Sequence, residues 1–118
     1  LKSAKATGIL PDQTPKDRNS GEFTPFFGQE ALTITLIASL VQKTKAKVFI
    51  GFAHRLENGN GFHFELKSVD SSIADSNPQV ATHTLNHEVE QLIKQAPEQY
   101  LWSYKRFKKV ADGKSPPY

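Results

Sequence analysis

Apolar and polar residues follow one another in blocks that predict short strands and two longer helices. Gly8-Ile9-Leu10 is a brief apolar run stopped by Pro11, a pattern that favours a buried strand ending in a turn. From Gln29 to about Lys43, apolar residues fall on every side of a helix, as they do in a buried helix. The β-branched residues of this segment leave a strand as the alternative, but the absence of a turn signal favours the helix.

The second half of the chain has clearer signals. Residues 47–56 predict a strand, and the Asn and Gly residues of 58–61 predict a hairpin turn, because both tolerate positive φ. Residues 62–69 alternate apolar and polar positions, which is typical of a half-buried strand. Asn77-Pro78 opens a helix in the order cap then proline, and residues 98–110 predict a final helical turn rich in aromatic residues.

This order of elements predicts an α/β fold built on a mixed sheet with flanking helices. A length of 118 residues allows one domain. The chain has no Cys, which excludes a disulfide scaffold, a thiolate zinc site and a Cys nucleophile. It has no Met either, so we expect Leu1 to follow a processing site or an upstream segment.

The basic residues gather in two clusters, at residues 43–55 and 101–118, on a chain with 15 Lys+Arg against 12 Asp+Glu. Such clusters could meet an anionic partner, or they could be ordinary solvated surface. The longest apolar run, residues 31–41, falls well short of the ~20 residues that span a bilayer. Any contact with a membrane is therefore expected from the side.

The histidines do not form a convincing site. His83 and His87 stand four apart, but the Glu of the zinc motif HExxH is replaced by Thr84. Both histidines are expected on the solvated face of their helix. Residues His83 and Glu88 match an H-x4-E pattern, yet on a helix they point about 140° apart and cannot form a dyad. His54 and His63 are expected on strand surfaces beside the hairpin turn.

Two other stretches could carry chemistry. Asp12 and Gln13 follow the predicted strand at 8–10, and α/β sheets place ligands at the carboxyl ends of their strands. A plain turn at Asp12 is the alternative. The aromatic and basic residues of 104–109 could stack bases and pair phosphates, or they could form an amphipathic helix end.

Three segments together resemble the lipid A biosynthesis acyltransferases of Gram-negative bacteria. They are Gly8-Ile9-Leu10-Pro11-Asp12-Gln13, Thr24-Pro25-Phe26-Phe27-Gly28 and the stretch from Glu98 to Lys108, which occur in this order across essentially the whole chain. The proteins of this family are over twice as long. The resemblance implies that residues 1–118 are the C-terminal part of one acyltransferase domain, an αβα sandwich like that of the glycerolipid acyltransferases.

The resemblance also implies an activity. The family transfers a fatty acyl chain from acyl carrier protein to a hydroxyl of a lipid A precursor, on the cytoplasmic face of the inner membrane, without a cofactor or nucleic acid. An upstream H-x4-D/E dyad, assisted by an Arg, is taken to deprotonate the hydroxyl. The dyad and this Arg are missing from the 118 residues, so we expect the N-terminal anchor and the dyad upstream, and no activity from this part alone.

The family motif carries over residue by residue. Asp12 is implied as an active-site acid that supports the dyad or binds substrate, with Gln13 beside it. Arg18 and Arg106 are implied as contacts for phosphates, lipid head groups or the acidic carrier protein. Phe26 and Phe27 are expected to pack under the site. The alternative function is a stand-alone basic α/β module that binds nucleic acid or another polyanion.

Overall fold

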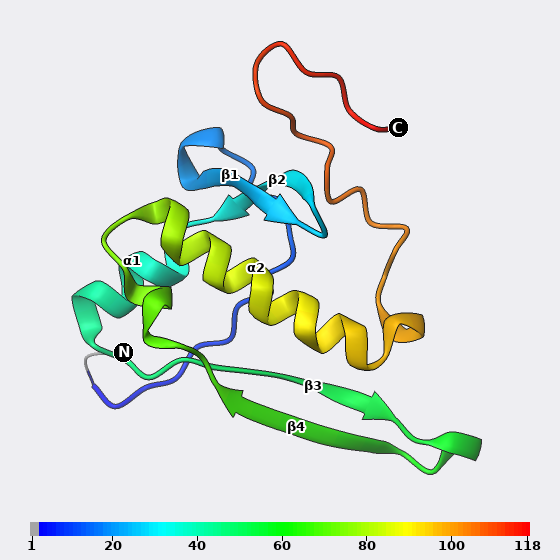
Figure 1. Ribbon diagram of the computed structural model, residues 1–118. Coiled ribbons are helices and arrows are strands. Elements are labelled where there is room, and N and C mark those ends of the chain that lie inside the picture. The colour runs from blue at the N-terminus through cyan, green and yellow to red at the C-terminus, as the bar shows by residue number, and fades with distance from the viewer. Residues whose placement is uncertain (1–2) are drawn as a thin grey trace.

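The computed structural model describes residues 3–118. One long helix lies at the centre of the fold (Figure 1). The helix, α2, lies between two β-hairpins and contacts a strand of each. The elements are β1 (Gly21–Phe26), β2 (Gln29–Ile34), α1 (Leu36–Thr44), β3 (Phe49–Arg55), β4 (Phe62–Ser68) and α2 (Pro78–Gln95), with short 3₁₀ turns before, between and after them. The C-terminal segment leaves α2 and passes the turn between β1 and β2.

Helix α2 begins and packs as its sequence predicts. The Asn77 side chain accepts a hydrogen bond from the Gln79 backbone, and proline occupies the first helical turn. The predicted apolar stripe is buried throughout, which confirms it as the core face: Ala81, Leu85, Val89, Leu92, Ile93 and Ala96. Val89 and Ile93 meet Phe26 and Ala31 of the first hairpin in the core.

The prediction of one helix from Gln29 to Lys43 is wrong for its first half. Residues 29–34 form β2, which pairs antiparallel with β1, and only the later residues form α1. The reason lies in the preceding turn, where Phe27 and Gly28 both have positive φ, the geometry that joins antiparallel strands most tightly. The Phe27 N–H also donates to Glu90 Oε1 of α2 at 2.7 Å, which ties this turn to the helix.

The second hairpin forms where the sequence predicts it, but the expected burial of β4 is wrong: its apolar residues Phe62, Phe64 and Leu66 are exposed, whereas Glu65 and Lys67 are half-buried. Strands β3 and β4 pair antiparallel around the turn at 57–61, with His54 opposite His63. One face of this hairpin packs toward α2 through Ile50, which contacts the core, and through an ion pair between Lys67 and Glu88 at 2.6 Å.

Three further predictions need correction. Residues 8–10 form no strand, because no described strand lies in register beside them. Residues 98–110 form no helix beyond the short turn Pro97–Gln99, because their side chains bond and pack onto several different parts of the chain. The α/β composition is confirmed, but the described residues form two separate two-stranded antiparallel sheets in place of one mixed sheet.

Candidate functional site

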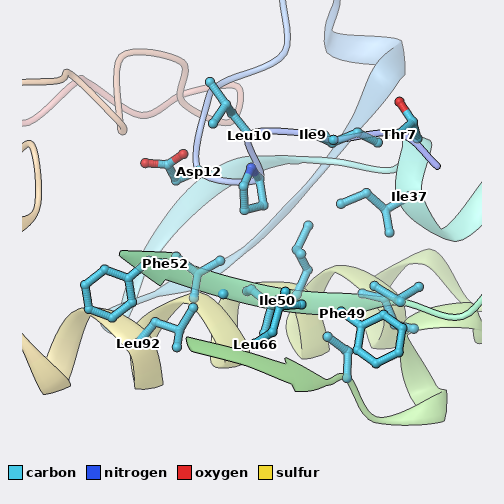
Figure 2. A pocket seen from close by; sticks show the side chains of 18 of the residues that line it. Thr7, Ile9, Leu10, Asp12, Ile37, Phe49, Ile50, Phe52, Leu66 and Leu92 are labelled. Carbon is cyan, nitrogen blue, oxygen red and sulfur yellow. The ribbon is translucent and has the colours of Figure 1, made fainter. Parts of the chain in front are cut away.

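A groove of about 1130 Å³ runs between the N-terminal segment, α1, the β3–β4 hairpin and α2 (Figure 2). Its walls are mainly apolar, and they combine Ile9 and Leu10 with side chains from all three neighbouring elements. In Figure 2, Asp12 and Phe52 lie toward one end of the groove, whereas Ile37 and Phe49 lie toward the opposite end. Long apolar walls with a carboxylate at one end suit a ligand that has an apolar chain and a polar head.

The Asp12 loop is held in place by the C-terminal segment, some ninety residues away in sequence. The Thr14 N–H donates to the Tyr104 hydroxyl oxygen at 2.9 Å, and the Thr14 hydroxyl donates to the Arg106 carbonyl at 3.0 Å. Lys109 Nζ donates to the Pro15 carbonyl at 2.8 Å. These bonds explain why residues 100–109 follow an irregular path: they reach across the molecule to fix the loop that carries Asp12.

Beneath this loop lies a buried polar network centred on Thr33. Its hydroxyl donates to the Ala31 carbonyl and accepts from Asn86 Nδ2 at 2.9 Å and from an Arg106 guanidinium nitrogen at 3.1 Å. Arg106 also donates to the Leu32 carbonyl at 2.8 Å. The network thus joins β2, α2 and the C-terminal segment with buried polar groups that satisfy one another.

Arg106 therefore lies in the interior. It is 3% exposed, its guanidinium stands 5.3 Å from the centre of the Phe26 ring, and burial lowers its pKa. A contact between this side chain and a carrier protein or lipid phosphate was expected from the sequence. The structure instead makes it a support between β2 and the Asp12 loop.

Tyr100 shares the groove wall with Asp12. Its ring packs near Phe26, with 6.4 Å between ring centres, and near Trp102, with 4.8 Å. Burial, together with the negative charge of Asp12, raises the pKa of Tyr100 to about 12. The phenol is therefore a neutral hydrogen-bond donor at physiological pH.

The other predicted residues lie around this core in different settings. Gln13 is exposed next to half-buried Asp12. Arg18 donates to the Val110 carbonyl at 2.6 Å, pairs with Asp112 at 3.3 Å and stacks over Phe23, so it too binds the C-terminal segment. Phe26 is buried, at 2% exposed, as expected. The expectation that Phe27 packs under the site is wrong, because it is 39% exposed at the turn.

His83 and His87 are exposed on α2 and His63 is exposed on β4, as expected. His54 is half-buried, and its Nε2 lies 2.8 Å from Glu65 Oε2. Within residues 3–118 no group of three or more His, Cys, Asp or Glu residues is arranged to hold a metal ion. In the same residues, no helix is both long enough and apolar enough to span a bilayer.

Sequence reasoning missed the roles of Thr33, Asn86 and Tyr100. Asn86 carried a usable signal, because it interrupts the apolar stripe of α2 between Leu85 and Val89 and a polar residue there needs a buried partner. Thr33 gave no such signal, since the segment around it was predicted as a helix.

Comparison with known proteins places this chain in a family. Residues 1–109 match the bacterial lipid A biosynthesis acyltransferases, and the chain belongs to that family. It is 26% identical over 114 residues to the lipid A biosynthesis lauroyltransferase of Escherichia coli (strain K12). The matched segment covers 96% of this chain and 37% of that relative. It is 30% identical over 120 residues to the lipid A biosynthesis palmitoleoyltransferase of the same organism. This match covers 100% of this chain and 38% of that relative.

A third relative, the lipid A biosynthesis myristoyltransferase of Escherichia coli (strain K12), is 28% identical over 115 residues, covering 92% of this chain and 33% of the relative. The chain thus spans about a third of the length of these relatives. The resemblance inferred from the Pro-Asp-Gln block and the two later segments is confirmed at the level of the family.

Proposed function

We propose that these 118 residues are the C-terminal part of an acyltransferase that moves a fatty acyl chain from acyl carrier protein to a hydroxyl of a lipid A precursor. The observation that carries this proposal is the apolar groove that ends at Asp12, the acid of the family's Pro-Asp-Gln block. Family membership supports the lipid A acceptor. We further propose that the reaction takes place on the cytoplasmic face of the inner membrane.

In this reaction the acceptor hydroxyl oxygen attacks the thioester carbonyl, the carbon–sulfur bond breaks, and the carrier thiol leaves with a proton. A general base must take the hydroxyl proton, and the H-x4-D/E dyad expected upstream would supply it. Residues 3–118 would supply two other parts. The groove would hold the acyl chain away from water, and Asp12 would support the reacting groups from the groove end. Gln13 and Arg18, in the loop that follows Asp12, would bind polar parts of the substrate.

The basic tail offers little support for the alternative of a polyanion-binding module. Lys109 donates to backbone carbonyls of the Asp12 loop, and Lys114 pairs with Glu30. The Lys108 ammonium stands 5.0 Å from the centre of the Tyr104 ring. These cations contact other groups of the same chain, and Arg106 is buried. The basic residues of 101–118 are therefore better explained as contacts that hold the C-terminal segment against the Asp12 loop and the first hairpin.

The test replaces Asp12 in the natural polypeptide that contains these residues. Asp12→Ala should lower the rate of acyl transfer to a lipid A precursor by at least about a hundredfold, because the groove end loses its carboxylate. The assay follows transfer of labelled acyl groups from acyl carrier protein, and circular dichroism checks that the variant is folded.

Asp75→Asn is the matched control. Asp75 is a half-buried acid that accepts a hydrogen bond from the Asn77 N–H, outside the groove, and asparagine can keep that bond. This variant should transfer acyl groups at the wild-type rate. A folded Asp12→Ala protein with near-normal activity would reduce Asp12 to a turn residue and contradict the proposal.

A further inference from the structure

Two buried hydrogen-bond donors near the groove end lack an acceptor. Within the described part of the chain, three buried side-chain polar atoms have no hydrogen-bond partner: Glu88 Oε2, Tyr100 Oη and Arg106 Nε. The first is accounted for by its ion pair with Lys67. The other two belong to neighbouring parts of the C-terminal segment, and burying such donors unpaired is costly.

Asp12 is the acid that both donors share. It lines the same groove wall as Tyr100. Its negative charge raises the pKa of Tyr100 and opposes the lowering of the Arg106 pKa that burial causes. Among the described residues Arg106 makes no ion pair with a carboxylate, although it is 3% exposed. A buried guanidinium needs an anion nearby. The loop that carries the Asp12 carboxylate is fixed to the C-terminal segment by the two Thr14 hydrogen bonds.

We propose that Tyr100 and Arg106 are positioning residues for Asp12, with the Tyr100 hydroxyl donating to the Asp12 carboxylate and the Arg106 guanidinium supplying the positive charge behind it. Arg106 is well suited to this role because Leu32 and Thr33 hold two of its nitrogens and the Phe26 ring holds its plane. The contact itself requires only this fold. Its consequence for catalysis rests on the proposed function.

The contact can be tested without any activity, in the natural polypeptide labelled with ¹³C at the tyrosine Cζ. Asp12→Asn should shift the Tyr100 Cζ resonance at neutral pH and lower the pKa of Tyr100 from about 12, because the carboxylate charge that raises it is removed. Asp75→Asn should leave both unchanged. A Tyr100 resonance and pKa that do not respond to Asp12→Asn would overturn the proposal.

The catalytic consequence is tested with Tyr100→Phe, which removes only the hydroxyl. We expect kcat for acyl transfer to fall by about 10- to 100-fold while KM stays within about twofold, since a misplaced carboxylate affects the reacting groups more than binding. Tyr118→Phe is the control, because Tyr118 is an exposed phenol that accepts from the Phe107 N–H. A normal kcat in Tyr100→Phe, or a raised KM with unchanged kcat, would contradict a positioning role.

The two experiments separate the two proposals. If the wild-type polypeptide transfers no acyl group to lipid A precursors but Asp12→Asn alters the Tyr100 signal, the proposed function fails and the positioning contact stands. If Asp12→Ala abolishes acyl transfer but the Tyr100 Cζ resonance does not change in Asp12→Asn, the proposed function stands and the positioning contact fails.

Discussion

At the scale of single residues, Thr33 is the point where three parts of the chain meet. Its hydroxyl binds a backbone carbonyl of its own strand, the Asn86 amide of α2 and the Arg106 guanidinium of the C-terminal segment. It is 0% exposed, so water cannot replace any of these partners. Removal of the hydroxyl would leave donors from two other elements without this acceptor.

Thr33→Val should therefore lower the free energy of unfolding by about 2–4 kcal/mol, although valine has nearly the same shape as threonine. Urea denaturation of the natural polypeptide measures this value from the transition midpoint. Thr35→Val is the matched control, because the Thr35 hydroxyl donates to the Ser20 carbonyl at an exposed site, and it should cost less than about 1 kcal/mol. Equal losses of unfolding free energy in the two variants would show that the buried network stabilises the fold no more than an exposed hydrogen bond does.

At the scale of elements, local signals decided which predictions succeeded. The hairpin at 49–68 carried turn residues and alternation, helix α2 carried a cap, and both formed at the predicted positions. The segment at 29–43 gave a mixed signal, because residues 32–36 alternate apolar and polar positions inside a longer apolar run without a turn residue. Its first half became β2 because the Phe27–Gly28 turn brought it back along β1, and cross-strand pairing outweighed its helical pattern of apolar residues.

The β3–β4 hairpin also depends on one position without a side chain. A Cβ added at Gly51 would overlap the Glu65 carbonyl oxygen of the neighbouring strand. Gly51→Ala should therefore force these strands apart locally and lower the free energy of unfolding by about 1–3 kcal/mol. Amide hydrogen exchange should show the loss of protection concentrated in β3 and β4.

Gly8→Ala provides the comparison for this substitution. A Cβ at Gly8 would meet nothing within 4 Å, so the same chemical change should leave stability and exchange nearly unaltered. Unchanged protection of β3 and β4 in Gly51→Ala would mean that the two strands have room for a methyl group between them.

At the scale of the whole molecule, the site is assembled from distant segments. The sequence drew attention to Asp12 through a short block of residues, and the family resemblance implied that Asp12 is an active-site acid. It did not reveal that residues 100–109 would fold back onto the Asp12 loop, because that path depends on tertiary hydrogen bonds between residues about ninety positions apart. The same limit explains Arg106, whose place among lysines suggested a surface and whose partners proved to be buried.

The groove is likewise a property of the assembled molecule. Its walls come from the N-terminal segment, α1, the second hairpin and α2, and no one of these segments shows in its sequence that the four enclose a space. The proposed function requires this space to hold an acyl chain, with the polar head beside Asp12 and the chain running toward Ile37 and Phe49.

A photoreactive acyl group tests that requirement most directly. The natural polypeptide would receive, as a thioester of acyl carrier protein, a fatty acyl chain with a diazirine at its far end, and mass spectrometry would map the cross-links after irradiation. We expect labelled residues in α1 and at the start of β3, around Ile37 and Phe49, and loss of labelling when unmodified acyl carrier thioester is in excess. Labelling outside the groove, or labelling that the competitor does not reduce, would contradict an acyl-binding role for the groove.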